Sequence, residues 1–583
     1  MPKLIVHLSG VWPKDFSLSN DDKIYAPASM DRKRTHERAM TIDVISSICE
    51  ASLCRKYANL YSKYQSYDST GMIFCFLNDF YSYSLRPCFL LMHSILKLAT
   101  DFPDHKLTIV SAGTDCEILP MFGFQTTESM RGSQDLMGSL VAKRLKPFVD
   151  SKNGDFVYVK GDFLRINKIR KILIWFVNFV FFTLFIIKCL SLNLFIKKSK
   201  NTHDKLIICR NRHQSRFAKE VVDNVSDSAI FLIPQLAQGR FVELMNIKNM
   251  GGCGFRLNFG MIFKSFIESR KGKKALERDL VRLRGISREC IEVEGVGVDV
   301  DLSWIADEIL RMSIFFFYKS ILSEVVDYYK VKKLISFELV GRMAGIEALA
   351  AREKGIGSAT VQTALISSRP HPVFPLSNYF FADSDITRSL IKDIGFFSLG
   401  EVKYVGPVCD VKSLKKVKRI NRVVFYSQPY EINVTLKIIN ILCLWAQKNE
   451  GKIKLRLHPR DRSERYQAIL REYSDIISFA TNENLTDLFE WADLSITRTS
   501  SVAKESLSSG CPVMLCLWSD FDRNVDADYI SRSLVNDYCS FGLHDFIDTV
   551  SSVEKIMISN HELHSRIFSG KTLSDLMVEV SDF

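Results

Sequence analysis

The sequence lacks the cysteine pairs that mark small metal or redox sites. Its 14 cysteines include no Cys-x-x-Cys pair, and two of the closest approaches are Cys49/Cys54 and Cys511/Cys516. This spacing argues against a zinc knuckle, a thioredoxin-like motif and a small secreted disulfide scaffold. We expect the cysteines to be buried hydrophobic residues of a protein that folds in a reducing cytoplasm.

Other absences narrow the class further. There are only 15 prolines and 28 glycines among 583 residues, with no low-complexity tract and no internal repeat, which excludes fibrous and disordered chains. The N-terminal apolar run is too short for a signal peptide. The glycine cluster at Gly251–Gly260 has no GK[ST] and predicts a loop, not a P-loop. No obvious DxD metal motif and no His/Asp/Cys cluster with metal-ligand spacing stands out, so we expect a metal-independent protein without a cofactor.

What is present is a hydrophobic, moderately basic chain. Hydrophobic residues make up 47%, and 78 Lys+Arg against 66 Asp+Glu leave a net charge of +12. This balance suits an anionic partner. Nucleic acid is not expected, because no basic module interleaved with aromatic residues occurs. The basic run at Glu268–Gly285 predicts a solvated helix face, or a surface for a polyanionic acceptor.

One segment concentrates apolar and aromatic residues between two basic clusters. Residues 172–187 read ILIWFVNFVFFTLFII, and after Lys188 the apolar run continues to Ile196. The uncharged part would span only about 24 Å as a helix, short of the ~30 Å hydrocarbon core. Basic residues flank both ends, so the positive-inside rule gives no orientation. We predict a monotopic membrane anchor on anionic head groups, with a true span or a buried core helix as alternatives.

Strand-like and helix-like patterns alternate on both sides of this segment. Apolar runs typical of strands occur at residues 3–10, 71–79, 106–113, 205–209 and 331–338. In the last third of the chain, strands are predicted at Arg422–Pro429, Lys452–Pro459, Ala492–Thr497 and Cys511–Trp518. Helix-length segments separate the strands, so the units are βαβ and the fold class is α/β with doubly wound parallel sheets.

The pattern divides the chain into four regions. We predict that two Rossmann-like domains face each other across a cleft, and that the hydrophobic helix is inserted in the N-terminal part. The first region is either part of the first domain or a separate unit. The regions are an N-terminal α/β region (1–166), the membrane-associated segment (167–201), an acceptor domain (202–402) and a nucleotide-sugar donor domain (403–583).

Polar residues follow the predicted strands of the last domain, where ligands of open α/β sheets bind. Gln428 ends the first strand, and His458 ends the second with Arg460 nearby. Thr499, Ser500 and Ser501 follow the third strand and precede a helix. Backbone N–H groups at a helix start, hydroxyls and a histidine favour phosphate. Together they predict a diphosphate or phosphodiester clamp, although each residue alone fits an ordinary cap or strand end.

These motifs resemble a known enzyme group. FYSQP, LRLHPRD and ADLSITRTSSVAKESLSSGCPV, in this order, are similar to the nucleotide-binding half of bacterial GT-B glycosyltransferases that use CMP-activated acidic sugars. The group comprises sialyltransferases, polysialyltransferases and capsule Kdo transferases. NYFFADSDITRSLIKDIGF followed by KYVGPV resembles the interdomain stretch of capsule and teichoic-acid transferases. The resemblance covers roughly residues 330 to 520.

The resemblance implies a GT-B fold and roles for matching residues. It implies that His458, Ser500 and Ser501 contact the CMP phosphate and cytidine, and that Glu505 contacts the nucleotide ribose. An exposed helix carboxylate without a ligand is the alternative role of Glu505. Gln428 matches a motif shared with the capsule Kdo enzymes. Where several relatives carry Gln-His-Gly, this chain has Gln362-Thr363-Ala364.

Glycosyl transfer also needs a carboxylate, as general base or as nucleophile. Glu338 is the first candidate, because it lies at the carboxyl end of a predicted strand. Asp115 has a similar position and is the second candidate, and Glu294 is the third. A carboxylate favoured by the dipole at a helix start is the alternative role of Glu338.

The sequence as a whole predicts a glycosyltransferase that moves an acidic ulosonic sugar, of the Kdo or sialic/pseudaminic type, from a CMP-sugar to a lipid-linked or growing surface glycan. The expected location is the cytoplasmic face of the inner membrane, peripheral or monotopic. Two alternatives stay open. One is a teichoic-acid type transferase of polyol phosphate from a CDP-polyol, which also releases CMP. The other is a non-catalytic polysaccharide-assembly protein with the same fold.

Overall fold

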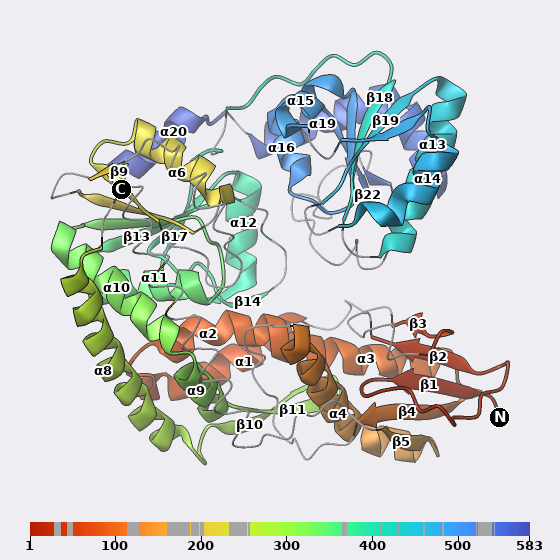
Figure 1. Cartoon of the computed structure of the whole chain (residues 1–583), viewed down its shortest axis with the longest axis horizontal. Helices are drawn as coiled ribbons and strands as arrows, with labels where there is room; N and C mark the ends of the chain where they lie inside the picture. The colour runs from red at the N-terminus through yellow and green to blue at the C-terminus, as the bar shows by residue number, and fades with distance from the viewer. Residues whose placement is uncertain are drawn as a thin grey trace. The chain divides into compact units, whose positions relative to one another are not determined.

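The computed structural model shows two compact units (Figure 1). Unit 1 comprises Met1–Thr360, Pro370–Tyr379 and Ile394–Glu401, and unit 2 comprises Val361–Arg369, Phe380–Asp393 and Val402–Phe583. The residues that the structure describes are 1–27, 36–42, 50–112, 127–159, 183, 187, 197–198, 203–210, 212–232, 253–254, 257–363, 366, 370–407, 410–428, 431–458, 461–480, 483–519, 522, 539–540, 543–568 and 570–583.

Unit 1 begins with a five-stranded sheet of its own. Its strands are β1 (Lys3–His7), β2 (Lys23–Ala26), β3 (Met40–Thr41), β4 (Lys106–Ala112) and β5 (Asp155–Val159). Their order is β3-β2-β1-β4-β5, and all neighbouring pairs are parallel. The apolar runs at residues 3–10 and 106–113 thus form β1 and β4, as predicted. The helices between the strands are α1 (Glu50–Tyr64), α2 (Met72–Phe80), a π-helical turn (Tyr81–Leu85), α3 (Arg86–Asp101) and α4 (Thr127–Ser151).

The predicted strand at residues 71–79 is wrong, because this run forms α2. All nine residues of α2 are buried. A helix that is buried all round shows neither the period of 2 nor that of 3.6, so a short apolar run of this kind reads equally as a buried strand. The helix lies against Gly345, where a Cβ atom would come 2.9 Å from the Cα atom of Cys75. The close crossing explains why that position is a glycine.

The second sheet has eight strands, most of them in unit 1. They are β6 (Lys197–Lys198), β7 (Lys205–Cys209), β8 (Ser228–Leu232), β9 (Cys253–Gly254), β12 (Lys333–Ser336), β13 (Gly357–Val361), β15 (Tyr379–Ala382) and β17 (Glu401–Tyr404). Their order is β17-β15-β13-β12-β7-β8-β9-β6, and every neighbouring pair from β13 to β6 is parallel. The division between the units passes through β13, β15 and β17. The strands predicted at residues 205–209 and 331–338 are β7 and β12.

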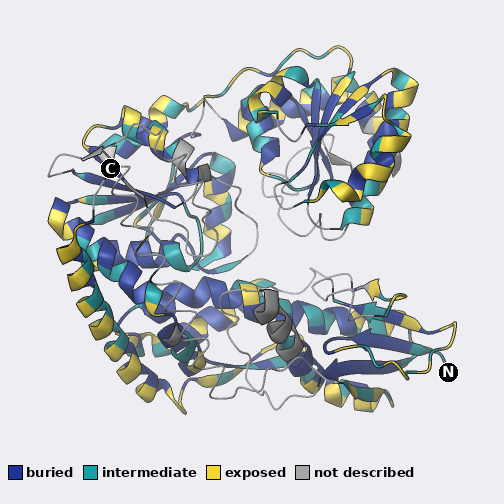
Figure 2. Ribbon diagram, viewed as in Figure 1, coloured by how far each residue is buried: buried dark blue, intermediate teal, exposed yellow. Residues whose placement is uncertain are grey.

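Helices and a hairpin complete unit 1. The helices are α6 (Arg212–Asn224), α8 (Phe259–Leu283), α9 (Leu302–Arg311), α10 (Ser313–Tyr329) and α11 (Arg342–Glu353). An antiparallel hairpin pairs β10 (Arg288–Val293) with β11 (Val296–Asp301), and a short parallel pair joins β14 (His371–Val373) to β16 (Gly395–Phe397). One hydrophobic core contains residues of both sheets, among them Val6 and Ile208. Figure 2 shows the buried strands inside and the exposed residues on the outer helix faces.

Unit 2 contains a six-stranded parallel sheet. The strands are β18 (Arg422–Tyr426), β19 (Lys452–Arg456), β20 (Ile477–Phe479), β21 (Leu494–Thr497), β22 (Val513–Cys516) and β23 (Cys539–Ser540). Their order is β20-β19-β18-β21-β22-β23, so the strand order reverses between β18 and β21. All four strands predicted for this region are present. The helices are α12 (Asp385–Ile394), α13 (Ile432–Asn449), α14 (Gln467–Glu472), α15 (Leu485–Trp491), α16 (Val502–Ser508), α18 (Leu543–Ser551), α19 (Val553–Ile567) and α20 (Leu573–Asp582).

The chain is therefore α/β with parallel sheets. The predicted membrane-associated segment at residues 172–196 lies outside the described residues, apart from Thr183 and Ile187. Within the part of the chain that the structure describes, no helix is both long enough and apolar enough to cross a membrane.

Candidate functional site

The candidate nucleotide site lies where the strand order of unit 2 reverses. Crevices outside the carboxyl ends of parallel strands at such a switch point are where α/β sheets bind ligands. Tyr426 of β18 pairs with Arg456 of β19 on one side and with Thr497 of β21 on the other. Gln428, His458 and Thr499 each follow this row by two residues. The sequence-predicted residues of three strands thus share one level of the sheet edge.

A buried hydrogen-bond relay fixes the loop that carries His458. The backbone N–H of His458 donates to Ser427 Oγ over 3.0 Å, and this hydroxyl donates to Asp461 Oδ2 over 2.7 Å. Tyr466, which is fully buried, donates to the same carboxylate oxygen over 2.5 Å. Burial raises the pKa of the Tyr466 hydroxyl, so it stays a donor. Gln428 is 6% exposed at the end of the neighbouring strand.

The hydroxyl run after β21 is only partly buried. Thr499 and Ser500 are half-buried and Ser501 is exposed. Ser500 Oγ accepts a hydrogen bond from the backbone N–H of Val502 over 3.3 Å. The Ser501 side chain makes no capping hydrogen bond to α16. Glu505 is half-buried in the first turn of α16.

Sequence reasoning missed the residue that ties the edges of these strands together, Arg498. It follows β21 directly and its side chain is fully buried. Its guanidinium donates to both carboxylate oxygens of Asp522, to Thr435 Oγ1 and to Ser519 Oγ. It also forms an ion pair with Glu431, whose carboxylate accepts from Ser519 Oγ over 2.7 Å. Arg498 therefore connects the loops after β18, β21 and β22.

Asp522 is the buried partner of this arginine. Its side chain is fully buried, and burial raises the pKa of the Asp522 carboxyl, while the positive charge of Arg498 lowers it. The effect of burial is the larger, so the pKa of the Asp522 carboxyl is raised overall.

The first carboxylate candidate, Glu338, lies at the switch point of unit 1. The eight-stranded sheet reverses its order between β7 and β12, where Lys205 pairs with Lys333. Arg210 and Glu338 each follow this pair by five residues, and their side chains form an ion pair. The Glu338 side chain is 28% exposed. Gly341, at φ +117°, leaves room for it, because a Cβ there would lie 3.0 Å from Glu338 Oε1.

Arg210 has a second, buried carboxylate partner. Its Nε atom lies 3.1 Å from Glu347 Oε1, and the Tyr318 hydroxyl donates to the same oxygen over 2.6 Å. Burial raises the pKa of the Glu347 carboxyl against the opposing effect of Arg210. The backbone N–H of Arg210 donates to Gln214 Oε1 over 2.9 Å. The Arg210 guanidinium thus pairs with a buried carboxylate, Glu347, and with a partly exposed one, Glu338.

Other predicted residues lie elsewhere. Asp115 and Arg460 are outside the described residues. Glu294 lies at φ +51° in the turn of the antiparallel β10–β11 hairpin, so it does not follow a parallel strand. Gln362 is buried, and its side chain accepts from the backbone N–H of Asp383 and donates to Thr387 Oγ1. Its amide is engaged within unit 2.

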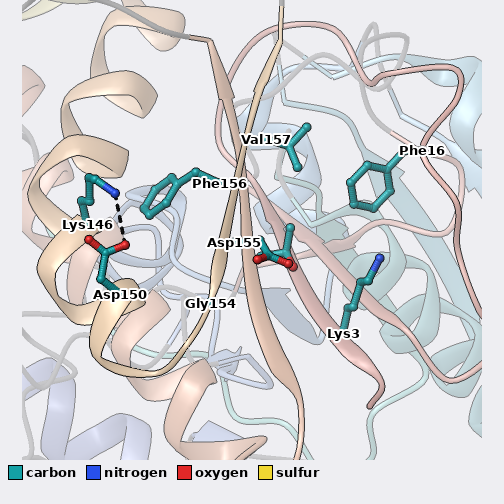
Figure 3. Close-up of a pocket in the computed structure, with 9 residues that line it drawn as sticks. Lys3, Phe16, Lys146, Asp150, Gly154, Asp155, Phe156 and Val157 are labelled. Carbon is teal, nitrogen blue, oxygen red and sulfur yellow. Dashed lines mark hydrogen bonds and ion pairs between the residues drawn. The ribbon is translucent and has the colours of Figure 1, made fainter.

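A hollow of about 500 Å³ occurs in the five-stranded sheet of unit 1, at the end where its strands begin (Figure 3). It lies at the amino ends of β1 and β5, lined by Lys3, Phe16, Lys146 and Asp155 among others. Figure 3 shows Lys146 beside Phe156. The Lys146 ammonium lies 5.1 Å from the centre of the Phe156 ring. Because parallel sheets bind ligands at the carboxyl ends of strands, we do not place the active site here. Among the described residues, no group of three or more His, Cys, Asp or Glu side chains has the arrangement of a metal site.

No family model and no curated protein matches the sequence. Solved structures with a similar course of the chain include S. aureus MnaA with UDP, at a TM-score of 0.40, 11% identity and coverage of 65% of this chain and 95% of that one. MurG of Acinetobacter baumannii has a TM-score of 0.39 and 12% identity, and the match covers 66% of this chain and 100% of that one. CalG4, the calicheamicin glycosyltransferase, has a TM-score of 0.38 and 8% identity, and the match covers 65% of this chain and 98% of that one. These likenesses concern the course of the chain and not its substrate.

Proposed function

We propose that the chain is a glycosyltransferase of GT-B architecture that uses a CMP-activated ulosonic sugar of the Kdo or sialic/pseudaminic type. The observation that supports this proposal best is the shared level of Gln428, His458 and Thr499 at the switch point of unit 2. A nucleotide at this place meets an amide, an imidazole and a run of hydroxyls. These groups suit a phosphate with an attached base and sugar.

The proposed reaction breaks the bond between the anomeric carbon and the phosphate oxygen of CMP. The electron pair of that bond moves to the phosphate oxygen, and an acceptor hydroxyl forms the new bond to the anomeric carbon. His458, Ser500 and Ser501 donate hydrogen bonds to the departing CMP, where negative charge develops. Arg460, Gln428 and Thr499 assist in holding the nucleotide, and Glu505 contacts its ribose.

Glu338 supplies the carboxylate of this reaction, with Asp115 as the second candidate. As general base it takes the proton of the acceptor hydroxyl, and as nucleophile it forms a glycosyl intermediate that the acceptor then displaces. The ion pair with Arg210 compensates the negative charge of the resting carboxylate. Its partial exposure leaves the carboxylate accessible at the strand edge.

The acceptor in this proposal is a lipid-linked or growing surface glycan. A chain that works on such an acceptor belongs at the cytoplasmic face of the plasma membrane, bound peripherally or through a monotopic segment. The basic surplus of +12 suits the anionic head groups of that surface.

A non-catalytic polysaccharide-assembly protein is the second candidate. The observation that favours it is the ion pair of Glu338 with Arg210, because a carboxylate held by a buried guanidinium also fits a purely structural role. In this case the chain binds CMP or a glycan without turnover.

A nucleotide panel tests the proposal. The thermal stability of the full chain is measured with CMP, CDP, UDP and GDP, because a ligand that binds only the native state raises the unfolding temperature. We expect the largest shift with CMP, and loss of that shift in Ser500→Ala but not in Ser565→Ala, a serine on α19. A clear preference for UDP would contradict the proposal.

Measurement of turnover distinguishes the three candidate functions, because all three are compatible with CMP binding. Release of CMP from CMP-Kdo or CMP-sialic acid in the presence of a glycan acceptor supports the transferase. A product that gains phosphorus from a CDP-polyol identifies the teichoic-acid type of transferase instead. CMP binding without turnover of any donor leaves the assembly protein.

A further inference from the structure

Helix α8 carries a stripe of exposed apolar side chains. Phe259 is 79% exposed, Phe263 is 67% exposed and Ile267 is 41% exposed. The three residues are spaced four apart, so they lie on one face of the first turns. Single exposed apolar residues are common on soluble proteins, but two phenylalanines and an isoleucine in one row form a patch.

The opposite face of α8 explains the orientation of this stripe. Met261, Leu276, Leu280 and Leu283 are buried, and α8 packs against α9 and α10. Gly272 allows the close crossing, because a Cβ at this position would lie 3.3 Å from the Phe316 ring. The helix is therefore fixed by its inner face, and the stripe points away from the unit. Figure 2 shows exposed residues along the outer side of this helix.

Basic side chains continue the exposed face beyond Ile267. The exposed basic residues of α8 outnumber the exposed acidic ones, Glu268 and Glu277. Lys271 is 67% exposed, and it pairs with Glu268 over 2.6 Å. Lys271, Lys274, Arg278 and Arg282 recur at steps of three or four along the same face and its flank. Lys264 and Arg270 are also exposed.

We infer that this face of α8 docks on the surface of a membrane that contains anionic phospholipids. A helix with aromatic and aliphatic side chains next to lysine and arginine lies in the head-group region with its apolar side chains inserted. The positive charges are complementary to the phosphates of anionic lipids. A soluble polyanionic glycan would match the charge but would leave the phenylalanines without a role.

This inference deepens the proposed membrane location and names the surface responsible, which is distinct from residues 172–196. Vesicle binding is measured without donor or acceptor, so a negative result leaves the proposed transfer reaction untouched. Conversely, if CMP fails to stabilise the chain, the proposal of the docking surface is unaffected.

Co-sedimentation of the full chain with vesicles tests the surface. One set of vesicles is phosphatidylcholine, and the other is phosphatidylcholine mixed with phosphatidylglycerol. We expect binding to the mixed vesicles, and at least about tenfold weaker binding of the F259S/F263S variant, because each ring loses its burial in the lipid. The matched control is Ile558→Ser, which removes a 60% exposed aliphatic side chain from α19. It should bind like the wild type.

A charge-reversal variant keeps the test independent of the aromatic residues. K274E/R278E should bind the mixed vesicles more weakly and lose most of the lipid dependence, whereas Lys448→Glu on α13 should not. Wild-type binding by F259S/F263S, or equal binding of the wild type to both vesicle types, would overturn the inference. It is also overturned if K274E/R278E loses binding to dextran sulfate while vesicle binding stays unchanged, because the face then recognises glycans.

Discussion

Arg498 Nε lies 2.9 Å from both carboxylate oxygens of Asp522, and both side chains are fully buried. The arginine comes from the end of β21 and the aspartate from the loop after β22, 24 positions later. A pair of this kind holds two loops at one sheet edge only while both partners are present. Removing one partner leaves an uncompensated buried charge.

Arg498→Met should therefore destabilise the chain strongly. We expect a loss of about 3 to 5 kcal/mol in the free energy of unfolding, measured by urea denaturation near neutral pH. The matched control is Arg422→Met in β18, whose ion pair with Asp493 over 2.9 Å leaves the arginine 49% exposed. That change should cost less than about 1 kcal/mol. Equal losses in the two variants would contradict the role of Arg498.

His458→Ala should reduce transfer without a comparable loss of stability. The imidazole follows β19 at the level of Gln428 and Thr499, and the backbone N–H of His458, which the substitution keeps, donates to Ser427 Oγ. Loss of one donor to a developing negative charge costs about 10² to 10³ in kcat. Steady-state kinetics with a CMP-sugar measure the effect, and Ser565→Ala on α19 should be unchanged. Wild-type transfer by His458→Ala from every CMP-sugar tested would refute the leaving-group role.

The strands of unit 2 were predictable because each combines a short apolar run with a polar residue at its end. The register of β18 with β19 and β21 then places Gln428, His458 and Thr499 at one edge. What the sequence did not show is which strands are neighbours. It also did not show the shortest strands, because β20 has three residues and β23 has two.

Arg498 was missed for a physical reason. In the sequence, Arg498 lies between a predicted strand and a run of hydroxyl residues, so it looks like one more basic residue near the predicted phosphate site. Its partners Glu431 and Asp522 lie 67 and 24 positions away, and no local pattern connects them. Helix α2 shows the opposite error, since its nine buried residues look like a strand until tertiary packing is known. Long-range pairing and all-round burial are the two properties that a single sequence hides.

Glu338→Gln should strongly slow transfer while the chain stays folded. Arg210 keeps its buried partner Glu347, so the unfolding free energy should fall by only about 1 to 2 kcal/mol. The rate of sugar transfer should fall by at least about 10². Glu347→Gln is the matched control, because it removes the other carboxylate on the same guanidinium and leaves Glu338 in place. If both variants transfer sugar like the wild type, Glu338 is a structural residue and the carboxylate lies elsewhere.

Glu347 gives a prediction on pH. Burial raises the pKa of its carboxyl above the ordinary value of 4.5, and Arg210 and Tyr318 oppose this effect. Between the ordinary and the raised pKa, the native chain keeps a proton that the unfolded chain has released. Its contribution to stability therefore falls as the pH rises through this window.

Glu347→Gln removes this titration, since glutamine is neutral at every pH. The unfolding temperature of the variant minus that of the wild type should increase as the pH rises from 4.5, and it should level off above the raised pKa. Thermal melts of both proteins at several values up to about pH 8 measure the difference. Ser565→Ala, an exposed serine on α19, removes no titratable group and should give a flat difference over the same range. A flat difference for Glu347→Gln as well would show that the buried carboxylate releases its proton no later in the native chain than in the unfolded one, and Arg210 would then fully offset the effect of burial.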